Sequence, residues 1–327
     1  MTKDQKEEDF LDDITFNNTK LPIDTRKKLK ITDIDNFALK LNKAARFDKG
    51  KFKLYQKKNK NIPDIKLTPA FNEKSLNDIE NNHANIVKSL KLSGYKIECL
   101  EFTPDWRMVI GLGNESVYET SMTLHHIYGI PYIPGSALKG VTRNWSITKH
   151  FSLSPKEIEE CKTPENIGKL QEKKALENED FCTIFGCTKD SFFKEERKGA
   201  VIFFDAFPVN LRNDKIKLDI MNPHYPEYYS GKEKWPTDDQ NPIPIFFLTL
   251  ENVKFDIYIG VKIKDDREIE PGGKKGNILE VTKECVKNAL FEHGIGAKTA
   301  VGYGVSKIEE NNPFGLSEAL TGIHSGN

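Results

Sequence analysis

The last predicted helix of the chain runs into the stretch His293-Gly294-Ile295-Gly296-Ala297-Lys298-Thr299-Ala300-Val301-Gly302-Tyr303-Gly304, which is followed by a short strand-like run at 305–308. Glycine allows positive φ angles and a close approach to another chain. A capped helix end followed by a tight turn explains Gly294 but not the other three glycines. Lys298 adds a cation and Tyr303 a flat ring. The loop therefore suits a ligand that contains both phosphates and bases.

The tripeptide Ala297-Lys298-Thr299 resembles the end of a nucleotide-binding P-loop, but its surroundings exclude one. A P-loop needs glycine directly before the lysine and joins a strand to a following helix. Here alanine takes the glycine position, and the predicted order is helix, loop, strand. We therefore reject nucleoside triphosphate binding.

Composition predicts a soluble chain of 327 residues, with 37% hydrophobic and 30% charged residues. No apolar run approaches the roughly 20 residues of a membrane span, and the charged first 13 residues are unlike a secretory signal. The five cysteines are irregularly spaced, which is typical of the cytoplasm. Cys182 and Cys187 lack the second close pair of a finger-like zinc site. We expect a cytoplasmic protein without metal or cofactor.

The charge balance is even overall and uneven along the chain. The 49 Lys and Arg match 49 Asp and Glu, which argues against a freely acting, highly basic nucleic-acid binder. Residues 20–60, however, hold 14 Lys and Arg against 4 Asp and Glu. This segment can attract phosphates, and it can equally be a solvated helical face joined to a flexible basic stretch.

Residues 1–95 are predicted to form a variable, basic and mainly helical region. The first 19 residues are polar and expected to be disordered. Asp35 or Asn36 can cap a helix that carries Phe37, and residues 76–92 show a second helical pattern. The Lys-rich residues 49–60 are predicted to be a loop.

Residues 96–312 are predicted to form one α+β domain, followed by a tail at 313–327. The domain is predicted to begin with strands at 96–102 and 106–111, joined by a turn at 103–105, and to continue with a helix that has Ser136 as its N-cap. A charged helical insertion at 148–181, a buried strand at 199–206 and a long loop at 208–243 follow. The last predicted elements are two strands within 245–263, which turn near Glu251-Asn252, and a helix at 278–291. Their order is that of split-βαβ, ferredoxin-like folds, a common platform for single-stranded RNA.

The start of the helix after Pro134 is a candidate anion site. Gly135, Ser136 and the first free N–H groups lie at the positive end of the helix dipole. Lys139 and Arg143 are four residues apart and share a helix face. These two cations, like Lys298, can be solvated charges or contacts to RNA phosphates. Their place beside a helix start and a glycine loop leads us to favour phosphate contacts.

Residues 134–140 (Pro-Gly-Ser-Ala-Leu-Lys-Gly) and the Gly-x-Gly-x5-Gly-x-Gly pattern of 294–304 resemble the two hallmark segments of the RAMP superfamily of CRISPR RNA-binding proteins. Residues 199–206 resemble the central strand of the family, and residues 184–186 (Ile-Phe-Gly) its Phe-Gly step. Narrower segments, at 124–129, 222–229 and 242–248, resemble a RAMP subunit of the type III-B (Cmr) effector complex. The resemblance covers residues 96–308.

The resemblance implies a ferredoxin-like (RRM-like) RNA-binding core within a complex directed by a guide (CRISPR) RNA. It implies a non-catalytic, structural subunit for antiviral defence, which caps the filament and holds the 3′-proximal guide RNA and the guide–target duplex. Its expected partners are guide RNA, target RNA and other Cmr subunits, especially a neighbouring backbone subunit, with no membrane. Cleavage of target RNA is expected from other subunits, and base pairing reads the sequence.

The candidate sites follow from these motifs. The expected RNA-binding residues are Gly135, Ser136, Lys139, Arg143, His125, His126, Gly294, Gly296, Lys298, Thr299, Gly302 and Tyr303. The long loop at 208–243 can stack on bases or form a subunit interface, and we favour the interface because it is rich in aromatic residues. The expected interface residues are His224, Tyr225, Tyr228 and Tyr229.

Two alternative hypotheses about the function stay open. His125 and His126 could make the chain a guide-processing endoribonuclease with a His general base. Adjacent residues on a strand point to opposite faces, so we favour structural or RNA-contact roles. Zero net charge also allows a pure interaction protein without RNA contact. Asp205 could bind metal or a 2′-hydroxyl, and we favour a role in capping backbone N–H groups.

Overall fold

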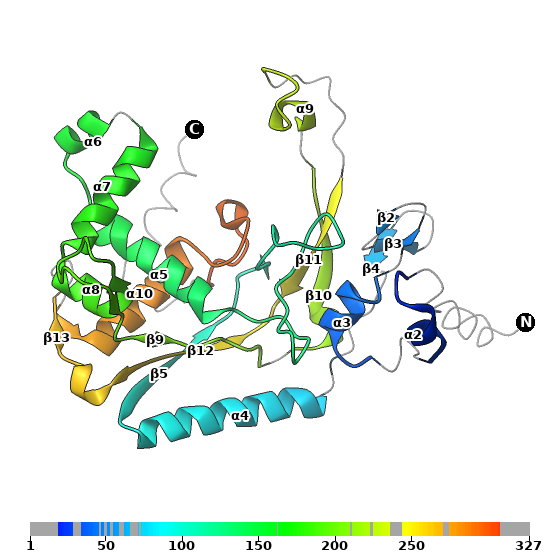
Figure 1. Ribbon diagram of the computed structural model, residues 1–327, viewed down its shortest axis with the longest axis horizontal. Helices are drawn as coiled ribbons and strands as arrows, with labels where there is room; N and C mark the ends of the chain where they lie inside the picture. The colour runs from blue at the N-terminus through cyan, green and yellow to red at the C-terminus, as the bar shows by residue number, and fades with distance from the viewer. Residues whose placement is uncertain are drawn as a thin grey trace, which may run out of the picture.

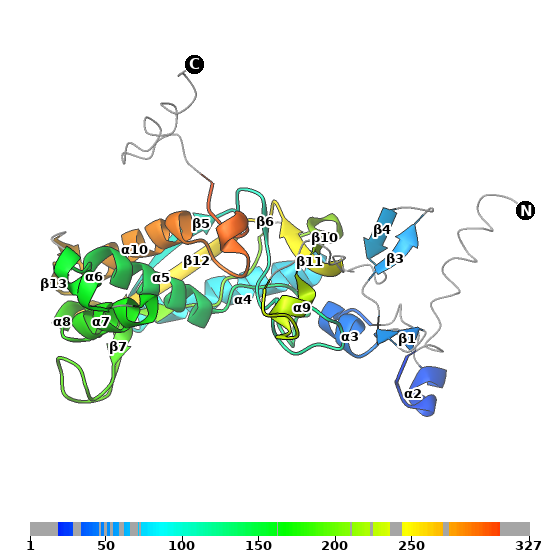
Figure 2. The same ribbon diagram turned by 90° about the horizontal axis from the view of Figure 1, so that it is seen from above.

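The computed structural model describes residues 19–28, 34–45, 47–48, 51–52, 55–58, 62–65, 71, 73–161, 163–209, 211–222, 225–235, 244–270 and 275–307. Helices and antiparallel sheets are mixed, which confirms the predicted α+β class. Figures 1 and 2 show a long molecule with most helices at one end and the N-terminal elements at the other. Within the described residues, no helix has the length and apolar character needed to cross a bilayer.

The first sheet has the strand order β5-β12-β9, formed by β5 (Tyr95–Phe102), β12 (Phe255–Lys262) and β9 (Ile202–Phe203). Both pairings are antiparallel. Beyond β5, Pro104 forms an antiparallel bridge with Ser306, which follows the glycine loop. This arrangement follows the split-βαβ order, with the predicted last strand reduced to a bridge. The predicted strand at 199–206 is shorter than expected, with a separate bridge from Ala206 to Ile133.

Helices α5 (Gly135–His150) and α10 (Ile278–Glu292) pack against each other and cover one face of this sheet. Alternation along β12 sends every second residue to that face, where the paired Phe102 and Phe255 are buried. Asn277 and Glu280 form a capping box that fixes the start of α10. The helix predicted at 278–291 is thereby confirmed.

Helix α4 (Glu73–Leu92), predicted from 76–92, lies across the opposite face of the sheet (Figure 1). Its His83 ring meets the Tyr258 ring of β12 edge to face, with centroids 4.9 Å apart. Because α4 covers this face, single-stranded RNA cannot spread across it as on an open four-stranded platform.

The second sheet has the order β10-β11-β6 and is built from β10 (Ile216–Met221), β11 (Ile245–Glu251) and β6 (Arg107–Met108). The β10–β11 hairpin carries α9 (Pro226–Tyr229) near its tip (Figure 1). Strand β10 shows that predicting a loop throughout 208–243 was wrong. The strands predicted on either side of the turn at 103–105 are present as β5 and a shorter β6, and they belong to different sheets.

The helical predictions outside the sheets are largely confirmed. The charged insertion forms α6 (Pro155–Cys161), α7 (Pro164–Leu176) and α8 (Glu179–Phe185). The N-terminal part contains α2 (Ile23–Lys28) and α3 (Phe37–Asn42). Asn36 caps α3, as predicted, by accepting a hydrogen bond of 3.0 Å from the Leu39 N–H.

The remaining elements are short. They are β1 (Phe47–Asp48), β2 (Lys51–Phe52), β3 (Tyr55–Lys58), β4 (Ile62–Ile65), β7 (Gly186–Cys187), β8 (Arg197–Lys198), β13 (Glu268–Ile269), β14 (Gly276–Asn277) and the 3-10 turns η3 (Asn213–Lys215), η4 (Ile263–Asp265) and η6 (Thr299–Val301). The prediction of a loop at 49–60 was wrong in part, because β2 and β3 lie within this range. The disorder predicted for 1–19 lies, except for Thr19, outside the described residues, as does the tail at 313–327.

The glycine loop closes on the chain's own backbone, although the sequence suggested approach to another chain. The Gly304 N–H donates to the Arg107 carbonyl at 2.7 Å, and the Ala297 N–H to the Val109 carbonyl at 2.8 Å. Gly304 has a φ of +67°, and a Cβ there would lie 1.9 Å from the Ile295 carbonyl oxygen. Gly302 also has a positive φ, of +91°, but a Cβ there would meet nothing within 4 Å.

We predict that Gly304→Ala destabilises the protein far more than Gly302→Ala. Both substitutions place a side chain at positive φ, which costs about 1–2 kcal/mol. Only the first also forces the loop off Ile295, so its free energy of unfolding should fall by at least about 3 kcal/mol. Urea denaturation of both variants measures this, and equal losses would contradict the packing described here.

Candidate nucleic-acid interface

A groove of about 770 Å³ lies between the glycine loop and the first turns of α5. It is lined by residues 111–113, by Ala137, Val141 and Asn144 of α5, and by residues 292–297 with Thr299 and Ala300. The two glycine-bearing segments singled out in the sequence therefore meet at one groove. Of the predicted RNA-binding residues, Gly294, Gly296 and Thr299 line it.

The start of α5 differs from the predicted anion site. Pro134 is the N-cap, and Ser136 is an exposed residue of the first turn, so predicting Ser136 as the N-cap was wrong. The Gly135 N–H donates to Asp205 Oδ1 at 2.7 Å. This bond confirms the capping role favoured for Asp205. Gly135 is buried against Phe203, whose carbonyl oxygen would lie 2.3 Å from a Cβ at this position.

Three cations gather on another side of α5. Lys139 is half-buried, and its pKa is lowered by burial first and then by Arg143 and Lys198. Arg143 has a partner, since it pairs with Glu172 at 2.8 Å. Within the described residues, no carboxylate pairs with Lys139 or Lys198. Such crowding of like charges is relieved by a bound anion. Lys198, at the exposed strand β8, was missed because it is distant in sequence.

The ring of Tyr303 does not face solvent. It is 5% exposed and packs against Trp106 and Phe247, with centroids 5.0 and 6.0 Å away. Its position leaves no open face on which a base could stack. Trp106, 47% exposed, is the ring at this place that remains accessible, and sequence reasoning missed it. Lys298 adopts a φ of +63°, and its Nζ lies 5.7 Å from the Phe247 ring centre.

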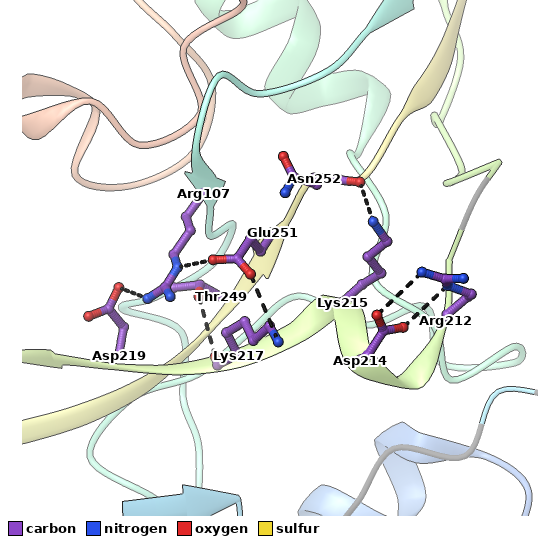
Figure 3. Close-up of polar contacts among 9 residues, drawn as sticks. All are labelled: Arg107, Arg212, Asp214, Lys215, Lys217, Asp219, Thr249, Glu251 and Asn252. Carbon is purple, nitrogen blue, oxygen red and sulfur yellow. Dashed lines mark hydrogen bonds and ion pairs between the residues drawn. The ribbon is translucent and has the colours of Figure 1, made fainter.

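An ionic network joins the three strands of the second sheet (Figure 3), and Tyr303 links it to the glycine loop. Arg107 donates to Asp219 at 2.7 Å and to Glu251 at 3.0 Å, and Tyr303 donates its hydroxyl proton to Asp219 at 2.7 Å. Burial acts to raise the pKa of Asp219, but hydrogen bonds from Tyr303, the Ile220 N–H and Arg107 outweigh it, so the pKa is lowered. Burial, and then the same carboxylate, raise the pKa of Tyr303.

His125 and His126 lie in a turn, so the expectation that a strand would separate them was wrong. Their rings stack with centroids 5.1 Å apart, and His125 also stacks on Tyr128 at 4.6 Å. Burial, and then His126, lower the pKa of His125. Asn36, the cap of α3, donates from its amide to the carbonyls of His126 and Ile127 at 3.1 and 2.9 Å. The N-terminal region therefore docks on this turn.

The family model described as the RAMP superfamily matches residues 103–307. The chain belongs to the RAMP superfamily. That match spans β6, the groove, the cation cluster and the glycine loop. Among the residues that the structure describes, no group of three or more His, Cys, Asp or Glu side chains could hold a metal ion in this RAMP protein.

Two curated relatives are similar to this RAMP chain. The CRISPR system Cmr subunit Cmr6 of Pyrococcus furiosus is 38% identical over 242 residues, which cover 62% of this chain and 66% of the relative. The Cmr6 subunit of Saccharolobus solfataricus is 28% identical over 237 residues, which cover 70% of this chain and 63% of the relative. The chain thus spans just under two thirds of the length of the relatives it matches.

Among solved structures, a chain of the type III-B Cmr-beta complex bound to cognate target RNA aligns with a TM-score of 0.49 and 23% identity. The alignment covers 71% of this RAMP chain and 65% of that chain.

Of the aromatic residues expected at a subunit interface, Tyr225 and Tyr228 lie near the tip of the β10–β11 hairpin. Tyr228 is 42% exposed and Tyr225 is half-buried. Trp235, 68% exposed and absent from the sequence prediction, lies in the same connection. His224 and the side chain of Tyr229 lie outside the described residues. An interface role for this tip stays a prediction.

We predict that Asp219→Asn lowers the free energy of unfolding of this RAMP protein by about 2 kcal/mol at pH 7. The lowered pKa means that the contribution is present above the unfolded pKa of about 3.9 and is lost as pH falls through the still lower folded value. The gap between wild type and variant should therefore close below about pH 4.

The matched control is Asp214→Asn, which breaks the exposed pair of Asp214 with Arg212 (Figure 3). Exposed pairs contribute little, so this loss should stay under about 0.5 kcal/mol at every pH. Urea titrations between pH 3 and 8 measure both. A loss for Asp219→Asn that does not change with pH would contradict the proposed charge state.

Proposed function

We propose that this RAMP chain is a non-catalytic, RNA-binding structural subunit of a type III-B CRISPR effector complex. It caps the filament and holds the 3′-proximal guide RNA and the guide–target duplex, with other Cmr subunits as neighbours. The similarity to two Cmr6 subunits supports the complex. Cleavage of target RNA belongs to other subunits.

The observation that carries RNA contact is the charge at Lys139 and Lys198, with which no carboxylate of the described residues pairs. A half-buried ammonium with two cationic neighbours is unfavourable unless an anion lies nearby, and RNA supplies phosphates at regular spacing. The groove on another side of α5 exposes loop backbone, which suits phosphate and sugar contacts. A strand that crosses the start of α5 would contact the cluster and the groove together.

The Asp205 carboxylate excludes the start of α5 as a phosphate site. It already accepts the Gly135 N–H at the helix start, and a phosphate placed there would meet its negative charge. We therefore propose that phosphate contacts come from Lys139, Lys198 and Arg143, with the loop residues Lys298, Thr299 and Gly302 beside the groove. In this proposal the helix dipole plays no part.

We predict that the double variant Lys139→Glu/Lys198→Glu, co-expressed with its neighbouring subunits, loses guide RNA. Removing two phosphate contacts to single-stranded RNA should reduce the slope of log K against log salt by about 1.4. Salt-dependent RNA retention on the purified complex measures this. The control Lys156→Glu/Lys169→Glu carries the same charge change on α6 and α7 and should leave the slope unchanged.

An assembled complex with unchanged RNA content and unchanged slope would contradict RNA contact through these lysines. That result would favour the pure interaction protein allowed by the zero net charge.

A second candidate function is guide-RNA cleavage, because the stacked rings of His125 and His126 lie together in one turn. A His base activates a 2′-hydroxyl without metal. Our proposal predicts no cut of a guide-repeat RNA by purified protein in EDTA. Cleavage that disappears in both His125→Ala and His126→Ala would establish the nuclease instead, and a denatured-protein control excludes a contaminating RNase.

A further inference from the structure

A separate cavity of about 570 Å³ lies between α4 and the sheet face opposite to α5 and α10. Its walls are one side of α4 from Leu76 to Ala84, residues 207–209 with Leu211, and β12. This volume falls in the range of about 300–1,000 Å³ that is usual for small-molecule sites. The guide-RNA proposal makes no use of this space.

Aromatic side chains form one part of the cavity wall. His83 meets Tyr258 at 4.9 Å and Phe207 at 6.0 Å, both edge to face. Burial lowers the pKa of His83, which favours its neutral form. A neutral imidazole, a phenol and a phenyl ring together suit a flat heteroaromatic ligand.

Asp256 supplies an acceptor inside the cavity. It points to the α4 face of β12, it is half-buried, and no hydrogen bond to its carboxylate occurs among the described residues. A half-buried carboxylate without donors is costly, and a ligand with N–H groups relieves that cost. Burial raises the pKa of Asp256, against the opposing effect of Lys254. Glu80 of α4 lines the same cavity and adds a second acceptor.

Two cations, Arg212 and Lys215, line the cavity. They lie just before the start of β10, at the edge of the second sheet (Figure 3). Arg212 is 71% exposed and pairs only loosely with the exposed Asp214, at 3.3 Å. Lys215 donates to the Asn252 carbonyl at 3.0 Å and keeps further N–H donors. Both groups can bind a phosphate.

We propose that this cavity binds a single nucleotide whose base carries an exocyclic amino group. The base lies among Phe207, Tyr258 and His83, its amino group donates to Asp256, and its phosphate lies at Arg212 and Lys215. The nucleotide is either free or an unpaired residue of an RNA. Adenine, cytosine and guanine carry the amino group. Uracil has none, and its N3–H donor lies between two carbonyl oxygens that a carboxylate repels, so the site discriminates against uridine. The inference stands independently of the guide-RNA surface at Lys139.

The test titrates the purified full chain with AMP, CMP, GMP and UMP by isothermal calorimetry. We expect at least one amino-bearing nucleotide to bind about tenfold more tightly than UMP, a difference of roughly 1.4 kcal/mol. Asp256→Ala, which removes the acceptor, should abolish that preference. Ala84→Trp, which fills the cavity from an exposed position of α4, should weaken binding at least tenfold. Asn85→Trp is the matched control, since Asn85 neighbours Ala84 on α4 but does not line the cavity.

A tetranucleotide that binds more tightly than its best mononucleotide identifies RNA as the source, and equal or weaker binding identifies the free nucleotide. Lys139→Glu/Lys198→Glu should leave mononucleotide binding unchanged, which separates this site from the guide-RNA surface. Circular dichroism confirms that each variant is folded. Three results would overturn the proposal: no binding at millimolar nucleotide, equal binding of UMP, or binding unaffected by Ala84→Trp.

Discussion

The return of the glycine loop onto β6 and the residue directly after it is the constraint on which the rest of the structure depends. Hydrogen bonds from Gly304 to Arg107 and from Ala297 to Val109 fix the loop. They bring the end of α10 beside the start of α5 and so create the groove between them. Arg107 also binds Asp219 and Glu251, which ties the second sheet to the same point. One short segment thereby positions both sheets.

Much of the core could be predicted because its signals are local. The helix spacing at 278–291, the cap at Asn36 and the near-alternation of apolar and charged residues along β5 each depend on neighbouring residues. Strand β10 was missed although Ile216 to Met221 nearly alternates apolar and polar residues, because the surrounding Pro and Tyr pointed to a loop. The assignment of β5 and β6 to different sheets has no local signal, since it arises from pairing with strands over a hundred residues away.

The candidate site shows the same contrast between features with a local sequence signal and features that arise only from tertiary contacts. The glycine spacing singled out a loop that does line the groove, through Gly294 and Gly296. The burial of Tyr303 against Trp106 could not be inferred from the sequence, because it is a tertiary contact. The same holds for the start of α5, where Asp205 and not Ser136 accepts a backbone N–H. Lys198 lies on β8, far from Lys139 in the sequence, and meets it only in the fold. The sequence therefore predicted residues that line the groove, whereas the cation cluster on which the RNA proposal rests is visible only in the fold.

The central claim is that RNA lies across the start of α5 and the glycine loop. RNA crosslinking mass spectrometry on the protein co-expressed with its neighbouring CRISPR genes tests it most directly. The account predicts crosslinks within residues 136–143, at Lys198 and within 294–304, to the 3′ part of a guide RNA. An assembled, RNA-containing complex without crosslinks at any of these positions would contradict it and would leave the chain with a protein-scaffolding role.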